Sequence, residues 1–178
     1  MRLTVPDLHD EVITLRPPRR SDADAITAAV QDPDIPAFTM VPTPYAVEDA
    51  IAWVERTAAS WRDGTAADFV VVDRETGELL GSVGVQPADE RTGRAEVGYW
   101  VSASARGRGV ASRALRLVAG WALDTVGLRR LEALVFVENE RSHRVAARAG
   151  FERGTVTRER IEHQGPRRDV VVWSRDAS

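Results

Sequence analysis

The stretch VSASARGRGVASRAL, residues 101–115, decides the fold, because it places a glycine-rich turn directly before a helical pattern. Gly107 and Gly109 stand between Arg106, Arg108 and Arg113. The first backbone amides of a helix lack carbonyl partners and carry the positive end of its dipole, so a turn with few side chains holds phosphate well there. The stretch therefore predicts a local anion site. The alternative is an ordinary glycine turn with solvated arginines.

The patterns on either side of this turn alternate between strand and helix. Before it we expect a strand at 11–17, a helix from an N-cap at Ser21, a Pro-rich loop at 32–45, a helix at 46–64, a hairpin at 68–86 with its turn at 75–77, and a strand at 94–102. After it we expect a helix at 109–126, a strand at 128–138, a helix at 140–150 and two strands at 152–162 and 167–175. The order is β-α-α-β-β-β-α-β-α-β-β.

This order predicts an α+β fold with a central, mixed but mostly antiparallel sheet of about seven strands and helices on both faces. The chain of 178 residues is long enough for one substantial core. We therefore expect a single domain over residues 1–178, with its core from about 10 to 176.

Composition limits the classes of function. The net charge is −3 and all 24 basic residues are arginine, which disfavours a nucleic-acid binder. The chain has no cysteine, and His9, His143 and His163 lack metal-ligand spacing, so we expect no metal site and surface positions for the histidines. No apolar run suits a membrane helix, and the first residues do not resemble a signal peptide, so we expect a cytoplasmic protein.

Two other phosphate motifs fit poorly. A nucleoside-triphosphate loop ends in Gly-Lys-Ser/Thr, and this chain has no lysine. A dinucleotide fingerprint would use Ser112 as its small third residue and Glu132 as its acid, but it requires a βαβ unit that starts at the turn. The predicted antiparallel strands before the turn argue against that unit.

Arg106-Gly-Arg-Gly-Val-Ala111 resembles motif A of the GCN5-related N-acetyltransferase (GNAT) superfamily, Gln/Arg-x-x-Gly-x-Gly/Ala. Three further stretches, AEVGYWV (95–101), NERSHRVAARAGF (139–151) and RRDVVVWSR (167–175), resemble its RimJ/RimL branch. The resemblance covers nearly the whole chain, and the order of its motifs agrees with the element order read from the patterns. It implies a GNAT fold and an acetyl-CoA-dependent N-acetyltransferase that acts on a primary amine, either a protein N-terminus or a small molecule.

The resemblance also implies where acetyl-CoA binds. Its pyrophosphate would lie on the backbone amides of Arg106 to Ala111, with Ser112 in the same turn of the helix. Its pantetheine arm would lie like an added strand between 96–102 and 131–137 and would bond backbone groups near Trp100, Val101 and Ser102. Asn139 would touch the arm. The cofactor-binding residues so implied are Trp100, Val101, Ser102, Arg106, Gly107, Arg108, Gly109, Val110, Ala111, Ser112 and Asn139.

Acetyl transfer needs an unprotonated amine, stabilisation of the oxyanion and a proton for the leaving thiolate. Glu96 is the first candidate for the base, although it is also placed to pair with Arg94; Glu138 and Asp68 are weaker candidates. The resemblance places Ser142 at the thioester sulfur as the proton donor. Many relatives have a tyrosine in that helix and this chain has none, so water is an alternative donor. As an alternative to both roles, Asn139 is a helix N-cap and Ser142 an ordinary first-turn residue.

Aromatic residues mark the predicted acceptor side. These are Phe38 and Tyr45 in the Pro-rich loop, Trp53 in the helix at 46–64 and Tyr99 in the strand at 94–102. The turn at 164–167 is expected beside them. The alternative is that these aromatic residues belong to the core. A second functional hypothesis is a non-catalytic acyl-CoA-binding module. A homodimer would suit the family, but no pattern in the sequence defines it.

Overall fold

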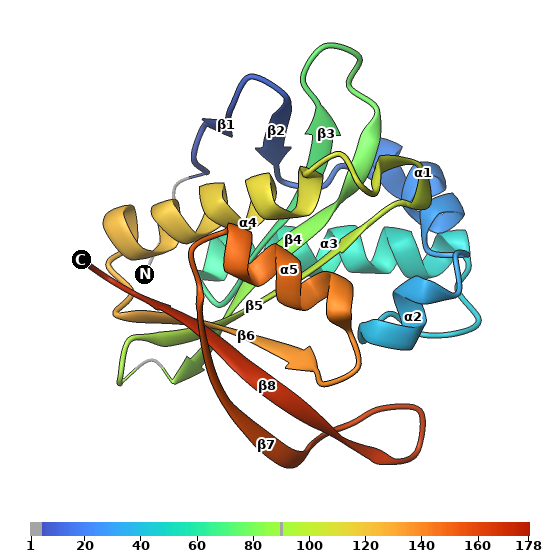
Figure 1. Cartoon of the computed structure of the whole chain (residues 1–178). Coiled ribbons are helices and arrows are strands. Elements are labelled where there is room, and N and C mark those ends of the chain that lie inside the picture. Colours follow the sequence, from blue (N-terminus) through green and yellow to red (C-terminus); the bar gives the residue numbers. More distant parts are fainter. Residues whose placement is uncertain (1–4, 90) are drawn as a thin grey trace.

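The computed structural model describes residues 5–89 and 91–178, which form an eight-stranded sheet in the order β1-β2-β3-β4-β5-β6-β8-β7 (Figure 1). The strands are β1 Leu8–His9, β2 Ile13–Arg16, β3 Ala67–Asp73, β4 Leu79–Asp89, β5 Arg94–Val101, β6 Arg130–Phe136, β7 Glu152–Glu162 and β8 Arg167–Asp176. All neighbouring pairs are antiparallel except β5 and β6, which are parallel. The predicted mixed, mostly antiparallel sheet is confirmed.

Helices cover both faces of this sheet (Figure 1). They are α1 Ala23–Ala29, α2 Asp34–Phe38, α3 Val47–Asp63, α4 Val110–Gly120 and α5 Glu140–Arg148. We name the two sides by their helices. Strand residues with α4 and α5 packed over them lie on the α4 face, and those on the side of α1 and α3 lie on the α3 face. Side chains alternate between the two faces along each strand.

Apolar side chains explain why the layers adhere. Leu115 and Val118 of α4 are fully buried against the α4 face, in the same core as Val83 of β4 and Val97 of β5. Burial of such side chains stabilises a fold by about 1.5–3 kcal/mol each. On the α3 face Ile26 of α1 packs in one apolar cluster with Ala50 of α3 and Val70 of β3. The sheet is therefore fixed between two apolar layers.

The parallel strands β5 and β6 pair over a short length only. Their register joins Arg94 with Arg130, Ala95 with Leu131 and Glu96 with Glu132, and no further pair follows among the described residues. Beyond Glu132, β6 continues along β8 as far as the pair Phe136–Val170, while β5 continues along β4. The sheet is consequently split between the carboxyl ends of β5 and β6, as the resemblance implied.

Most predicted boundaries agree with the structure. Gly64, Gly127 and Gly150 close their helical segments with positive φ values of 70°, 82° and 83°. The hairpin turn at 75–77 joins β3 and β4, and Gly77 has a φ of 73°. Positive φ is easily reached by glycine alone, so each of these stops is encoded locally.

Eight strands are present where about seven were expected, because the two-residue strand β1 adds to the edge of the sheet. Three expectations were wrong in detail. Helix α2 forms within the predicted Pro-rich loop. Ser21 does not cap α1, because it lies inside a short 3-10 turn at Arg20–Asp22 that precedes the helix. The predicted helix at 109–126 changes to a π-helical turn at Trp121–Thr125.

Two of the three histidines are not at the surface. His143 is 7% exposed and accepts a hydrogen bond from Trp173 Nε1, whereas His163 is 5% exposed and bonds the carbonyls of Pro36 and Thr39. His9 is exposed as expected. In the described part of the chain no helix is both long and apolar enough to cross a membrane. Residues 1–4 of the polar N-terminal tail, and residue 90 of the connection between β4 and β5, lie outside the described residues.

Candidate functional site

A cavity of about 1290 Å³ runs through the split in the sheet. Its lining comes from both faces: the glycine turn and α5 on one side, and α2, α3 and the α3 face of β3, β4 and β5 on the other. Ligand pockets in proteins usually hold about 300–1,000 Å³. The cavity is therefore large enough for a donor and an acceptor that meet at the split.

The glycine turn presents free backbone amides to this cavity. Gly107 and Gly109 both have a φ of 75°, and a Cβ atom at either would meet nothing within 4 Å. The amide of Arg113 donates to the carbonyl of Gly109, so the helical ladder begins there and the amides of residues 110–112 have no carbonyl one turn earlier. Ser112 Oγ donates to Gly109 O at 3.0 Å. This arrangement fits a diphosphate, which needs donors and close backbone approach.

The three arginines around the turn have different surroundings. Arg106 lines the cavity and forms ion pairs with Asp32 at 3.1 Å and Asp34 at 3.3 Å. Arg108 lies 3.6 Å from Asp73, at the β3–β4 turn. Arg113 is not among the lining residues, and its guanidinium reaches Asp10 and Glu11 at 2.7 Å each. Of the three, Arg106 is the one that lines the cavity.

The end of β5 forms one wall of the split. Trp100 and Val101 line the cavity, on the α3 face and the α4 face respectively. Ser102 is 8% exposed, and both its amide and its hydroxyl donate to the carbonyl of Leu80, at 2.9 and 3.0 Å. The Ser102 side chain thus fixes the end of β5 to β4 and does not line the cavity.

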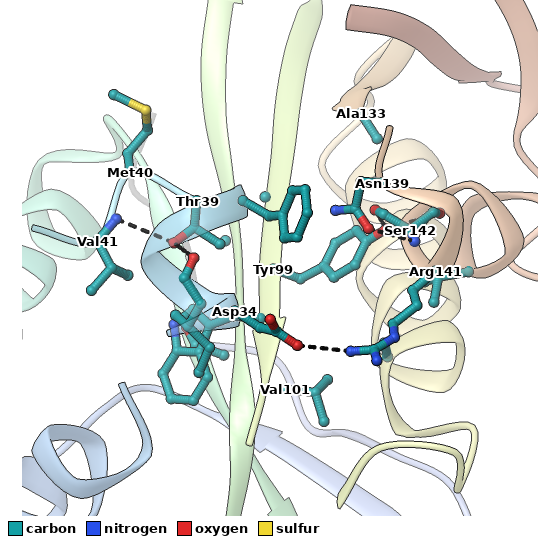
Figure 2. A pocket seen from close by; sticks show the side chains of 18 of the residues that line it. Asp34, Thr39, Met40, Val41, Tyr99, Val101, Ala133, Asn139, Arg141 and Ser142 are labelled. Carbon is teal, nitrogen blue, oxygen red and sulfur yellow. Dashed lines mark hydrogen bonds and ion pairs between the residues drawn. The ribbon is translucent and has the colours of Figure 1, made fainter. Parts of the chain in front are cut away.

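Helix α5 brings two expected residues to the opposite wall. Asn139 caps the helix, since its side-chain oxygen accepts the Ser142 amide at 3.2 Å, as the N-cap pattern predicted. The Ser142 hydroxyl lies 2.5 Å from the hydroxyl of Tyr99, which points across from β5 (Figure 2). Burial raises the pKa of Tyr99 to about 12, although the bond with Ser142 opposes the shift. The phenol therefore keeps its proton throughout the neutral range.

An ion pair crosses the cavity below this contact. Arg141 of α5 binds Asp34 of α2 at 2.9 Å, and Figure 2 shows the pair between Tyr99 and Val101. The same carboxylate also binds Arg106. Asp34 thereby joins α2 to both the glycine turn and α5.

The candidate carboxylates differ in their surroundings. Glu96 lines the cavity and lies 3.9 Å from Arg160, whereas Arg94 pairs with Glu132 at 2.5 Å. Glu96 is therefore not occupied by Arg94. Glu138 is paired with Arg168, and that hydrogen bond lowers the pKa of its carboxyl group. Asp68 lines the cavity from β3.

The predicted acceptor residues lie on the α3 side. Phe38, Tyr45 and Trp53 line the cavity, and Tyr45 and Trp53 also pack against the apolar cluster of α1 and α3. Tyr99 lines the cavity from the α4 face, near α5. The turn at 164–167 does not line the cavity. Its Gln164 side chain donates to Pro36 O at 3.2 Å and so contacts α2.

Two contacts of the site could not be predicted from the sequence. Asp34 and Arg141, 107 positions apart, gave no pattern that pairs them. The contact between Tyr99 and Ser142 supplies from a strand the phenol that the fifth helix lacks. Alternation along AEVGYWV does place Tyr99 opposite Glu96, Gly98 and Trp100, so its face could be predicted even though its partner could not. In residues 5–89 and 91–178 no three His, Cys, Asp or Glu side chains gather as metal ligands.

Comparison with known proteins points to acetyl transfer. The family model described as "Acetyltransferase (GNAT) domain" matches residues 13–152. The chain is 28% identical over 169 residues to the Bacillus subtilis (strain 168) "Uncharacterized N-acetyltransferase YoaA", covering 95% of this chain and 96% of that protein. It is 30% identical over 104 residues to the "Ribosomal-protein-serine acetyltransferase" of Escherichia coli (strain K12), covering 58% and 57%.

A solved structure agrees in fold and in ligand class. Mycobacterium smegmatis RimJ in complex with CoA-disulfide superposes with a TM-score of 0.84 at 28% identity, covering 99% of this chain and 88% of that one. The cavity at the split is thus found in a chain whose relative was crystallised with a CoA derivative.

Proposed function

Since the chain belongs to the GNAT acetyltransferase family and uses acetyl-CoA as its co-substrate, we propose that it acetylates a primary amine that enters the cavity from the α3 side. The acceptor is a peptide N-terminus or a small-molecule amine. An α-amine has a pKa near 8 and a lysine amine one near 10.4, so about neutral pH the former needs less help from a base.

Acetyl-CoA supplies the activated acetyl group. We propose that backbone amides of the turn from Arg106 to Ala111 bind its pyrophosphate, among them the unpaired amides at the start of α4. Backbone groups of Trp100 and Val101 bond its arm, with Asn139 beside it. Ser102 is left out of this role, because its amide donates to Leu80 O and its carbonyl accepts the Ala105 amide. A fixed amide near Trp100 or Val101 stabilises the oxyanion, because its dipole needs no reorganisation during the reaction.

Proton transfer is divided between the two faces. On the α3 face Glu96 is the proposed base for the amine. On the α4 face Ser142 donates a proton to the leaving thiolate, and the Tyr99 hydroxyl, 2.5 Å away, replaces it. The group that accepts a proton and the groups that donate one thus lie on opposite faces of the sheet. The acetyl group would lie between them, at the split.

The observation that carries this proposal is the continuity of the cavity from the glycine turn through the split to Trp53 and Phe38. A donor and an acceptor therefore reach one point from two sides. A module that only binds acyl-CoA needs no part of the cavity on the α3 side.

The test measures CoA release from acetyl-CoA with a panel of amines: peptides that begin with serine, alanine or methionine, spermidine, free amino acids and an aminoglycoside. We expect release that depends on the amine and an acetylated product by mass spectrometry. Glu96→Gln should lower turnover and leave acetyl-CoA affinity unchanged. Binding of acetyl-CoA without release for any amine would support the non-catalytic module instead.

A cytoplasmic location and a homodimer are further parts of the proposal. The reaction requires a compartment that contains acetyl-CoA, and a chain without cysteine does not depend on an oxidising one. Sedimentation equilibrium of the purified chain tests the dimer.

A further inference from the structure

Asp68 lies on the α3 face at one end of a row of residues that continues across the sheet with Gly84 and Gly98. In the sheet register Asp68 of β3 stands beside Gly84 of β4, and Gly84 stands beside Gly98 of β5. Adjacent strands are about 4.8 Å apart, so this glycine row spans about 10 Å from Asp68 to Gly98. All three residues line the cavity, and Gly98 lies two positions beyond Glu96, where the split begins.

The two glycines do different things for the Asp68 carboxyl group. A Cβ atom at Gly84 would come within 2.0 Å of Asp68 Oδ1, so the carboxyl group leans across the sheet over this residue. A Cβ atom at Gly98 would meet nothing within 4 Å. Gly84 therefore gives the carboxyl group its position, and Gly98 leaves an open passage between that position and the split.

Asp68 is held firmly but is only partly satisfied. Its backbone carbonyl accepts Trp61 Nε1 at 2.9 Å, and its Oδ2 accepts a long hydrogen bond from Thr57 Oγ1 at 3.5 Å. No donor among the described residues contacts Oδ1. Burial raises the pKa of Asp68, and the Thr57 bond opposes the shift in part. A partly buried carboxylate with one free oxygen is suited to accept a proton from a cationic ligand.

Other charged groups around the same part of the cavity are few. Glu96 comes from β5, Asp49 and Arg56 come from α3, and the phenol of Tyr45 precedes that helix. Glu96 is near Arg160 at the β7 side, so it has a cationic neighbour where Asp68 has only a hydroxyl. This difference separates the two carboxylates chemically.

We propose that Asp68 is a catalytic residue that binds the acceptor as an ammonium ion in the glycine row and takes its first proton before attack. The inference rests on the proposed function. An ammonium group must lose two protons to become an amide: Asp68 takes the first, the neutral nitrogen attacks the thioester carbon, and the C–S bond breaks. Glu96 takes the second proton, the thiolate gains one through Ser142, and one net proton leaves to solvent.

Asp68→Asn tests this role, with Asp63→Asn on the exposed end of α3 as the matched control. The acceptor is the panel amine with the fastest CoA release. At about pH 6.5, where that amine is an ammonium ion, we expect kcat/KM for the amine to fall about 100-fold in Asp68→Asn. The melting temperature and the acetyl-CoA dissociation constant should stay close to those of the wild type.

The pH profile separates chemistry from structure. Above the pKa of the amine the acceptor is already neutral, so the defect of Asp68→Asn should shrink several-fold or more as the pH rises past that value. A defect that is equal at all pH values, or no defect, would overturn the proposal. If the wild-type protein releases CoA with none of the amines in the panel, the proposed function is overturned, and the role of Asp68 is overturned with it.

Gly98→Ala provides a second, steric test. The added methyl group has free space, so the fold should be retained, but it narrows the passage between Asp68 and the split. We expect a higher KM for the amine with an unchanged dissociation constant for acetyl-CoA. An unchanged KM would show that the amine does not pass over Gly98, and would count against the glycine row as its binding place.

Discussion

The hydroxyl of Tyr99 lies 2.5 Å from the hydroxyl of Ser142 and joins the strand before the glycine turn to the helix beyond the split. Because the pair acts as one hydrogen-bonded unit, we expect Ser142→Ala and Tyr99→Phe each to lower kcat by about 10-fold or more without weakening acetyl-CoA binding. The double variant should be no slower than the slower single variant. Ser60→Ala on α3 is the control. Additive losses would show that the two hydroxyls act separately.

The phenol also gives a prediction for pH. Tyr99 has a pKa of about 12, and the donating form is the protonated one, which is present below that value. Ionisation of Tyr99 should therefore cause no loss of kcat up to about pH 10, the pKa of an ordinary tyrosine. A fall in kcat near that pH in the wild type, absent from Tyr99→Phe, would contradict the assignment.

The backbone approach at the glycine turn is tested by Gly109→Trp. Gly109 and Gly77 have φ values of 75° and 73°, and both have open space at Cβ. The two tryptophan variants thus suffer similar backbone strain, but only the first blocks the amides of α4. Calorimetry should detect acetyl-CoA binding to Gly77→Trp and none to Gly109→Trp. Binding by both would remove the turn from the donor site.

The carboxylate of Asp34 contacts both Arg106 and Arg141, and we predict that it competes with the phosphates of CoA for these guanidinium groups. Asp34 pairs with Arg141 and shares Arg106 with Asp32, so Asp34→Asn frees Arg141 and leaves Arg106 with one carboxylate instead of two. Partly exposed pairs are worth about 0.2–1 kcal/mol, so we expect CoA to bind about 1.4- to 5-fold more tightly at low salt. Glu55→Gln, which breaks the exposed pair with Arg20, should not change this affinity. Weaker binding would mean that Asp34 orders the site for CoA.

The pair of Asp22 and Arg16 predicts pH-dependent stability. Burial of Asp22 favours the neutral acid, but hydrogen bonds from Arg16 and the Arg19 amide outweigh it and lower the pKa of the carboxyl group. A lowered pKa adds stability above the unfolded value of about 3.9 and loses it as the pH falls through the folded value.

Asp22→Asn should accordingly reduce the free energy of unfolding at neutral pH by about 1–3 kcal/mol, or the melting temperature by roughly 2–12 °C. The difference from the wild type should vanish in acid, and Asp24→Asn, at an exposed position of α1, should have little effect. Thermal melts at both pH values measure this. A constant difference would assign the loss to packing.

Local signals explain what the sequence predicted well. Gly109, Gly150 and the Gly77 turn need positive φ, so one residue type marks each place. Asn139 was predicted as a cap for a similar local reason. By contrast, α2 could not be predicted, because its five residues are too few to show a helical period and include Pro36. Proline is nevertheless tolerated in the first turn of a helix. The pairing of Asp34 with Arg141 depends on how two distant helices are placed, and no local pattern records that.

The brief parallel contact between β5 and β6 has a mechanical consequence. It divides the sheet into two parts that are joined near Ala95 and Leu131. One part, β1 to β5, contains Glu96 and Tyr99, and the other, β6 to β8, carries α5 with Ser142. Glu96 and Tyr99 are held by the pairing of β5 with β4, whereas Ser142 is held on α5, which packs on α4, β6 and β7. The angle between the two parts therefore affects the distance between Glu96 and Ser142, so a substitution where β5 and β6 pair is expected to change turnover while every side chain of the proposed mechanism stays intact.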